Sequence, residues 1–397
     1  MRYAIVTETW PPEVNGVALT VHGLAEGLRQ RGHRVTVVRP RQQHGQPAQP
    51  HERLVPGLPV PRYPGLRVGL PAGRRLALLW QQHRPDAVYI ATEGPLGWSA
   101  LRTARRMGIP VATGFHTRFD HYMRDYVRPR PVAGALERVA LRWMRGFHNR
   151  AQATLVPTHQ LHAELAALGF AHPVRLPRAV DTQLFDPRRR DEALRAEWGV
   201  PPGALAVIHV GRIAPEKNLP LAIEAFRALQ VHQPDARFVW VGDGPAREAL
   251  QRAHPDFVFR GIRRGEDLAR HFASADLFLF PSRSETYGNV TLEAMASGVP
   301  TVAFDYGAAR ECLRESHGAA VGGQHASRDA DAAFVAAAVR IANDATLRTR
   351  MGMAARDAVS ALRPAQVAAD FDAILHRLAR EATAHGQPQP AAPLARQ

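Results

Sequence analysis

The sequence has 397 residues, enough for two or three domains, and its 45% apolar and 22% charged residues are typical of a soluble globular protein rather than a disordered one. A single cysteine excludes an internal disulfide framework, no apolar run approaches the roughly 20 residues that span a bilayer, and we recognise no signal peptide, so we expect a cytoplasmic protein. The net charge of +15 arises in residues 1–190, where 28 arginines face 12 acidic residues (28 − 12 = +16), which favours anionic partners such as phosphorylated ligands, anionic lipid or nucleic acid.

The first half of the chain alternates between short apolar runs and segments with helical periodicity. The apolar runs, rich in Val, Ile and Ala, lie at residues 3–7, 34–38, 87–91, 110–114, 153–156 and 174–176. Continuous apolar strands that alternate with helices are typical of a parallel sheet covered on both faces. We therefore predict a Rossmann-like, doubly wound α/β domain over residues 1–186.

A segment at residues 136–147 has the periodicity of a helix with one apolar face. Its apolar positions are Leu136, Val139, Ala140, Trp143, Met144 and Phe147, and Arg138, Arg142 and Arg145 lie on the other side. One interpretation is a surface helix whose apolar face packs on the first sheet. The other is an interfacial helix that docks on the anionic inner face of the cell membrane, where each arginine contributes about 1 kcal/mol.

The second half repeats the alternating pattern, with apolar runs at residues 205–210, 237–241, 257–259, 277–280 and 300–303. We predict a second doubly wound domain over 187–362, reached by a linker near 186–190. A helix at 363–384, placed to pack back on the first domain, and a disordered tail at 385–397 follow. Because such sheets bind ligands beyond the carboxyl ends of their strands, the two domains should face a central cleft that holds the site.

Two permanent cations stand in the loop after the first strand of the second half. Arg212 and Lys217, the only lysine in the chain, are five residues apart between a strand end and a helix start. A diphosphate suits this combination of a planar guanidinium, a mobile ammonium and nearby helix N–H groups. The alternative is a solvated basic loop in which Asn218 caps the helix.

Two carboxylates follow a later strand of the same half. Glu285 lies in the loop after residues 277–280, and Glu293 lies in the first turns of the next predicted helix. Carboxylates accept hydrogen bonds from pairs of sugar or ribose hydroxyls, and Gly288 between them lets the backbone approach a ligand closely. Taken singly, Glu293 is equally an acid that complements the helix dipole, and Glu285 a solvated loop residue.

Together these motifs resemble a known family. Residues 211–218, 241–245, 271–276 and 285–293 of the second half, with 11–17, 115–117 and 180–185 of the first, are similar to the GT-B glycosyltransferases of family 4. The similarity covers nearly the whole chain except the tail. It implies two Rossmann-like domains facing a cleft, a nucleotide-sugar donor, retention of anomeric configuration, and no metal or other cofactor.

The resemblance also implies roles for individual residues. Arg212 and Lys217 match the positions that hold the donor diphosphate as it leaves, and Glu285 matches the residue that grips the donor-sugar hydroxyls. Glu293 matches the ribose-binding residue, and His116 matches a first-domain histidine that reaches the donor sugar. His116 is equally a core histidine with both nitrogens satisfied.

The remaining donor-site positions come from loops. Gly16 matches a flexible loop that closes beside the diphosphate, and Tyr287, Gly288 and Asn289 match backbone that supports sugar and phosphate. Ile262 lies at the base-contacting strand end, where backbone contacts do not separate uracil from guanine, so the donor is a UDP- or GDP-sugar. We place no metal ligands, because the one Asp-x-Asp, at 329–331, lies beside a surface-like helix.

One departure concerns Ala179, where relatives usually have glycine. We infer a negative φ there, which leaves the roles of Arg178 and Asp181 open. The motifs look most like members that glycosylate diacylglycerol or related lipids, so we expect a hexose to pass to a membrane lipid.

The alternatives are a polysaccharide or small-molecule acceptor, a sugar-nucleotide epimerase, or a non-catalytic protein that binds nucleic acid through its basic half. Nucleic acid is not expected, because the sequence lacks an aromatic single-strand platform, a helix-turn-helix pattern and zinc-finger spacing.

Overall fold

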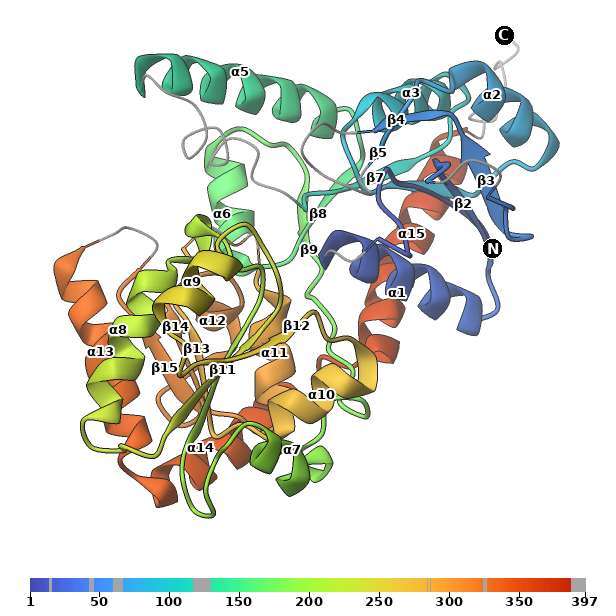
Figure 1. Ribbon diagram of the computed structural model, residues 1–397. Coiled ribbons are helices and arrows are strands. Elements are labelled where there is room, and N and C mark those ends of the chain that lie inside the picture. The colour runs from blue at the N-terminus through green and yellow to red at the C-terminus, as the bar shows by residue number, and fades with distance from the viewer. Residues whose placement is uncertain are drawn as a thin grey trace, which may run out of the picture.

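The computed structural model describes residues 1–13, 16–42, 46–59, 67–116, 130–283, 285, 287–323 and 327–386. Over these residues the chain forms two α/β domains, each built around a parallel sheet with helices on both faces (Figure 1). The predicted fold class, two doubly wound parallel sheets, is confirmed.

The first sheet has seven parallel strands in the order β3-β2-β1-β6-β7-β8-β9. The strands are β1 (Arg2–Val6), β2 (Arg34–Pro40), β3 (Glu52–Val55), β6 (Ala87–Ile90), β7 (Val111–Gly114), β8 (Ala153–Val156) and β9 (Pro173–Arg175). The helices are α1 (Gly16–Gln30), α2 (Gly73–Gln82), α3 (Pro95–Arg106), α5 (Arg130–His148) and α6 (His159–Ala167), and β4 (Gly57–Pro59) pairs antiparallel with β5 (Arg67–Gly69). The strand order reverses between β1 and β6, the point at which such sheets bind ligands.

Alternate residues of β1 enter two different cores. Tyr3 and Ile5 pack in the core beneath α1, whereas Ala4 and Val6 pack in the core beneath α2 and α3. Because both faces are buried, the central strands are continuous apolar runs, and every run predicted in this half is a strand. The edge strand β3 was not predicted, because its Glu52 is a charged residue that is buried by pairing with an arginine.

The second sheet has six parallel strands in the order β12-β11-β10-β13-β14-β15. The strands are β10 (Ala206–Val210), β11 (Arg237–Val241), β12 (Val258–Gly261), β13 (Leu277–Phe280), β14 (Thr301–Phe304) and β15 (Gly318–Val321). The helices are η1 (Pro187–Arg189), α7 (Glu192–Glu197), η2 (Pro215–Lys217), α8 (Leu219–Gln230), α9 (Arg247–Ala253), α10 (Gly265–Ala273), α11 (Asn289–Ala296), α12 (Gly307–Cys312), α13 (Arg328–Ala342) and α14 (Ala345–Ala358).

The edge strand β15 was not predicted, because three of its four residues, Gly318, Ala319 and Ala320, are small rather than β-branched. A side chain at Gly318 would place its Cβ 2.6 Å from the carbonyl oxygen of Thr301, so the close pairing with β14 requires glycine at this point.

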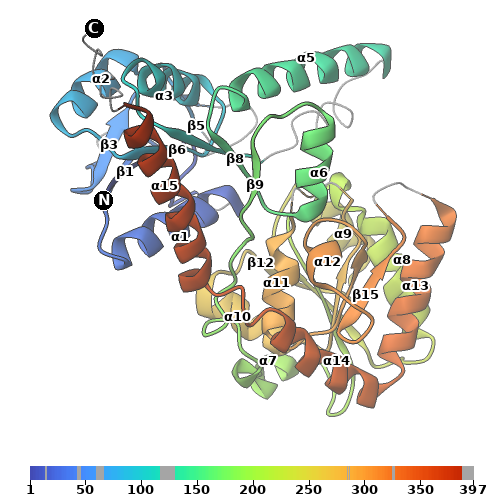
Figure 2. The same cartoon turned by 180° about the vertical axis from the view of Figure 1, so that it is seen from behind.

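The chain passes between the domains twice, along segments that lie side by side. Leu176 belongs to the first core, but Val180 and Phe185 pack in a core of the second domain, ahead of the boundary predicted at residue 186. Val180 N donates to the carbonyl oxygen of Leu362, where the chain returns. The last helix, α15 (Pro364–Gly386), then lies along α1 on the first domain (Figure 2). The predicted tail falls on its last two residues and on 387–397, which lie outside the described residues.

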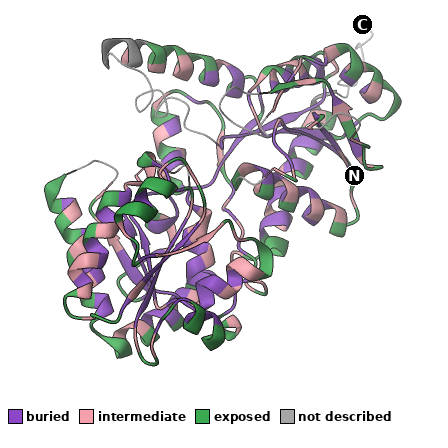
Figure 3. Cartoon of the chain, in the orientation of Figure 1, coloured by how far each residue is buried: buried purple, intermediate pink, exposed green. Residues whose placement is uncertain are grey.

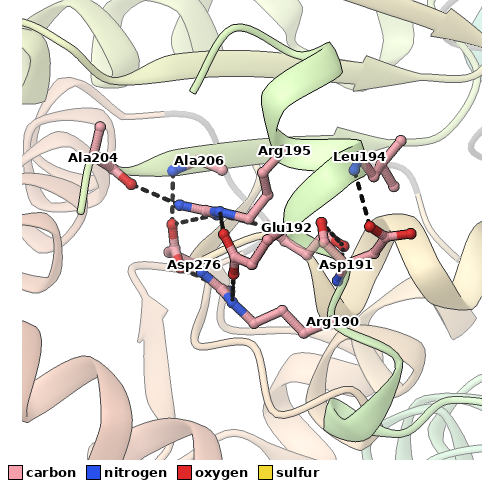
Figure 4. A network of polar contacts seen from close by, with 9 residues as sticks. Arg190, Asp191, Glu192, Leu194, Arg195, Ala204, Ala206 and Asp276 are labelled. Carbon is pink, nitrogen blue, oxygen red and sulfur yellow. Dashed lines mark hydrogen bonds and ion pairs between the residues drawn. The ribbon is translucent and has the colours of Figure 1, made fainter. Parts of the chain in front are cut away.

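A polar network fastens the start of the second domain to its sheet (Figure 4). The Asp276 carboxylate accepts from Arg190 at 3.0 Å, from Arg195 at 2.9 Å and from the backbone N–H of Ala206 at 2.7 Å. Arg195 is buried and also donates to the carbonyl oxygen of Ala204. The aspartate that ends the 271–276 motif thus joins α7 to the first strand of this sheet, which is a structural role.

Candidate active site

The loop after β10, residues 211–218, is held against the loop after β11. Gly211 N donates to Val241 O and Ile213 N donates to Asp243 O, both at 3.0 Å. A Cβ on Gly242 would lie 1.9 Å from Gly211 O, and one on Gly244 would lie 2.3 Å from Ile213 O. The glycines of the 241–245 motif are therefore needed for close packing, and that packing positions the cation-bearing loop.

Asn218 ends this loop with a left-handed backbone turn, φ 54° and ψ 45°. The turn separates the short helix η2 from α8, and the Asn218 side chain donates to the carbonyl oxygen of Pro281 at 3.4 Å. This contact ties the loop after β10 to the loop after β13. Asn218 does not cap α8 with its side chain, because that amide bonds across to the neighbouring loop instead.

Lys217 and Glu285 form an ion pair at this junction. The ammonium of Lys217 donates to Oε1 of Glu285, which also accepts from the Ser282 hydroxyl at 2.9 Å. The Glu285 amide donates to the Tyr306 hydroxyl, which itself donates to the carbonyl oxygen of Ser282 at 2.8 Å. Burial alone would raise the pKa of Glu285, but the charge and hydrogen bond of Lys217 and the bond from Ser282 outweigh it and lower that pKa. Glu285 is therefore an ionised acceptor at neutral pH.

Arg212 lies in the same loop with 45% of its side chain exposed. Its Nη1 approaches Oε1 of Glu216 at 3.4 Å, a weak surface contact. The structure thus brings Lys217 and Glu285 together and leaves the Arg212 guanidinium at the rim of the same loop.

Glu293 projects from α11 and is only partly exposed. Among the residues that the structure describes, its carboxyl has no hydrogen-bond or ion-pair partner. Burial raises the pKa of Glu293 to about 7. A desolvated carboxyl with free acceptor oxygens is suited to a ligand that supplies hydroxyl donors.

The start of α11 faces the first domain. Gly288 adopts φ 89° at the N-cap and has no side chain with which to cap the helix. Thr291 N donates to Gly288 O at 3.0 Å, so among the described residues the N–H groups of Asn289 and Val290 are the ones left for an acceptor. A Cβ built on Gly16, the first residue of α1, would lie 3.6 Å from Nδ2 of Asn289. These two predicted donor-site positions therefore meet across the domains. Tyr287 is buried behind them, and Ile262 is 56% exposed after β12.

His116, which follows β7, has both ring nitrogens occupied. Nδ1 lies 2.6 Å from Nη2 of Arg178, and Nε2 lies 2.7 Å from the Tyr89 hydroxyl. Burial and the Arg178 charge lower the pKa of His116 well below its usual value, so the ring is neutral. This conformation matches the second interpretation of His116, a core histidine whose two ring nitrogens both have hydrogen-bond partners.

Sequence reasoning left Arg178 without a role and missed Ser282 and Tyr306. Asn218 is the one described non-glycine residue with positive φ, so Ala179 avoids the left-handed conformation, as inferred. Arg178 carried no signal of its own, because the domain boundary was predicted at residue 186, whereas the first crossing lies between Leu176 and Val180. Ser282 and Tyr306 carried none, because their contacts depend on how two separate loops pack.

In the described part of the chain, no cluster of three or more His, Cys, Asp or Glu side chains has the arrangement of a metal site. Asp331, from the single Asp-x-Asp, lies in the first turn of α13 and accepts from Arg283 at 2.6 Å.

The helix at 136–147 is the middle and end of α5, and its two ends differ (Figure 3). Met144 and Phe147 are fully buried, as expected for packing on the first domain. Leu136, Val139 and Trp143 are 36%, 66% and 43% exposed, and this part of α5 extends away from both sheets (Figures 1 and 2). None of the described helices is long and apolar enough to span a bilayer.

Comparison with known proteins follows the same division into two parts. Residues 14–184 match the family described as Glycosyltransferase Family 4, and residues 204–344 match Glycosyl transferases group 1. A GDP-mannose-dependent alpha-mannosyltransferase of Mycolicibacterium smegmatis is 38% identical over 79% of this chain and 82% of its own length. An alpha-monoglucosyldiacylglycerol synthase of Streptococcus pneumoniae is 24% identical over 76% of this chain and 71% of its own. The solved sucrose-phosphate synthase of Thermosynechococcus elongatus has the same fold, with a TM-score of 0.76 and 18% identity over 96% of this chain and 99% of that one.

Proposed function

The chain belongs to glycosyltransferase family 4 and is a glycosyltransferase, and from that premise we propose that it transfers a hexose from a UDP- or GDP-sugar to a membrane lipid such as diacylglycerol. We propose further that the transfer retains the anomeric configuration and needs no metal ion. The family sets aside the alternative of a non-catalytic nucleic-acid binder.

The pairing of Lys217 with Glu285 carries this proposal. An ammonium has three donors, and Glu285 uses one, so others remain for a diphosphate held between Lys217 and Arg212. As the sugar departs, negative charge grows on the diphosphate, and these two cations with the free N–H groups of α11 stabilise it. The second oxygen of Glu285 accepts from the sugar hydroxyls, and Glu293 accepts from the ribose.

GDP-mannose is the first donor to test. The mycobacterial relative that is 38% identical is named for it, and the same site chemistry accepts the diphosphate of any such donor. Purified enzyme, radiolabelled GDP-mannose or UDP-glucose, and diacylglycerol in mixed vesicles should give a chloroform-soluble labelled product. Two results would contradict a lipid acceptor: release of the labelled sugar as free hexose by hydrolysis alone, or retention of the label on the nucleotide with every lipid tested.

Two observations support a lipid as the acceptor. The pneumococcal relative is named as an alpha-monoglucosyldiacylglycerol synthase. In this chain, α5 exposes Val139 and Trp143 beside arginines in the basic first half. An apolar strip flanked by arginines suits the boundary between head groups and acyl chains of anionic lipid. A soluble glycan that is labelled in the same assay would instead favour the polysaccharide alternative.

A further inference from the structure

Arg178 is a buried guanidinium that has no acidic partner among the described residues. It is 8% exposed, and its one hydrogen bond among the described residues joins Nη2 to Nδ1 of His116. The other buried arginines of the described chain are paired, Arg39 with Glu52 at 2.8 Å and Arg195 with an aspartate at 2.9 Å. Arginine stays charged in proteins, and burying a charge without a counter-ion is unfavourable. Such a group indicates that an anion is present in the working state.

Three elements hold this guanidinium in place. Arginine only donates, so His116 Nδ1 must accept, and its Nε2–H then donates to the Tyr89 hydroxyl. Tyr89 in turn packs edge-on against Phe371 of α15, with 5.0 Å between ring centroids. A Cβ on Gly114 would lie 2.2 Å from the Tyr89 hydroxyl oxygen, so only glycine leaves room for this contact. The neutral His116 orients the cation without neutralising it.

The position of Arg178 places it between the two domains. It lies between Leu176, in the core of the first domain, and Val180, in a core of the second. Its guanidinium is bonded to His116, the first-domain residue predicted to reach the donor sugar. Arg178 is therefore attached to a predicted donor-site residue, but it is distinct from Arg212 and Lys217, the two cations proposed to hold the diphosphate.

We propose that Arg178 binds an anionic oxygen group, a phosphate or a carboxylate, of a bound substrate. The inference rests on the proposed function, because the anion belongs either to the diphosphate of the donor or to an anionic head group of the acceptor. The substrate anion would neutralise the Arg178 charge, which no described side chain does. His116 and Tyr89 act as positioning residues that orient the Arg178 guanidinium.

The test compares Arg178→Met and Arg178→Lys with Arg175→Met, a nearby arginine whose side chain is 37% exposed. Thermal stability of each free protein is measured first, then the affinity for GDP, UDP and inorganic pyrophosphate by calorimetry. KM is then measured for diacylglycerol and for phosphatidylglycerol, whose head group carries both an anionic phosphate and free hydroxyls. The free Arg178→Met protein should melt at or above the wild-type temperature, because an unpaired buried charge is removed. Should that variant not fold, Arg178→Lys, which keeps the charge without the planar fork, carries the same comparison.

A tenfold or greater loss of affinity for GDP, UDP or pyrophosphate assigns the anion to the donor. Unchanged nucleotide affinity with at least a tenfold higher KM for phosphatidylglycerol, but not for diacylglycerol, assigns it to the acceptor. Unchanged binding and KM in both arms, or a lower melting temperature as the sole effect, would overturn the inference. Wild-type protein that binds neither GDP nor UDP would instead refute the proposed function itself.

Discussion

Lys217 is the single lysine among 51 basic residues, and the structure holds its ammonium on a carboxylate rather than in solvent. Glu285, its partner, is largely buried and keeps its charge because of that ammonium. At this position arginine would present a planar fork, whereas a compact ammonium can serve an acid and a diphosphate at once. In the proposed function, Nζ of Lys217 therefore serves both Glu285 and the diphosphate, and Arg212 of the same loop serves the diphosphate alone.

Replacing Lys217 or Glu285 by alanine should lower turnover by roughly 10²–10³-fold, because each change removes a group aimed at the departing diphosphate or the sugar. Far-ultraviolet circular dichroism and the melting temperature should show that the fold is kept. Arg252→Ala, an exposed arginine of α9, is the matched control and should turn over at the wild-type rate. Near-normal donor consumption by both site variants would contradict the assignment.

Because Glu293 is partly buried, the stability of the protein should depend on pH. Burial raises its pKa in the folded protein to about 7, from an ordinary value of 4.5. Between these values the folded protein holds a proton that the unfolded chain has lost, so the contribution of Glu293 to stability is present below pH 4.5 and is lost as the pH rises through 7. Glu293→Gln should therefore match wild type in denaturant unfolding at pH 5 and exceed it by roughly 1–3 kcal/mol at pH 8.

The same substitution should weaken nucleotide binding by roughly 10–100-fold, since a charge-assisted hydrogen bond to the ribose is lost. Stabilisation together with weaker binding separates a ligand-facing acid from a structural one. Equal stability of the two proteins at pH 8 would show that the Glu293 carboxyl is solvated rather than buried.

At the scale of elements, the central strands were predictable because burial on both faces leaves a continuous apolar run. The edges were not, as Glu52 in β3 and Gly318 in β15 show, because there a buried ion pair or a close backbone contact replaces the apolar signal. The candidate site shows the same limit. The sequence places Arg212 with Lys217, and Glu285, in separate loops after strands, but it does not show that Lys217 and Glu285 pair. The contact between His116 and Arg178 likewise depends on tertiary packing of residues 62 positions apart.

The two ends of helix α5 fit the two interpretations of its sequence pattern, a surface helix packed on the first domain and an interfacial helix. Its end packs on the first domain through Met144 and Phe147, as an ordinary surface helix would, while Val139 remains 66% exposed. Val139 is exposed together with Leu136 and Trp143 on the same helix, and large apolar side chains that gather on one surface are typical of an interaction site. The part of α5 that leaves the domain is thus the element through which we expect membrane docking.

Val139→Asp should reduce co-sedimentation with phosphatidylglycerol vesicles by roughly tenfold without changing the melting temperature, because it places a negative charge where the helix meets anionic lipid. Val231→Asp is the control, since Val231 is 77% exposed but lies on the second domain. Equal loss of binding in both variants, or none in Val139→Asp, would show that α5 does not dock. Vesicles of phosphatidylcholine alone should bind none of the proteins.

At the scale of the whole molecule, the two domains are joined by two adjacent crossings and approach each other where the donor is proposed to bind. Val180 and Leu362 hydrogen-bond where the crossings meet, and Gly16 of the first domain faces Asn289 of the second. The geometry of the site therefore depends on how closely the domains sit as well as on residues within one of them.

Gly16 tests that dependence directly. A Cβ there would lie 3.6 Å from Asn289 Nδ2, an ordinary contact, so Gly16→Ala should act nearly as wild type, whereas Gly16→Leu should wedge the domains apart. Because an error of about 1 Å in a catalytic arrangement costs about 10²-fold, turnover of Gly16→Leu should fall by roughly that factor with unchanged melting temperature. Gly23→Leu, in the same helix with open space around it, is the control and should keep full activity. Small-angle scattering with GDP-mannose should show compaction of wild type but not of Gly16→Leu, and equal activity of the two leucine variants would mean that the site lies within the second domain alone.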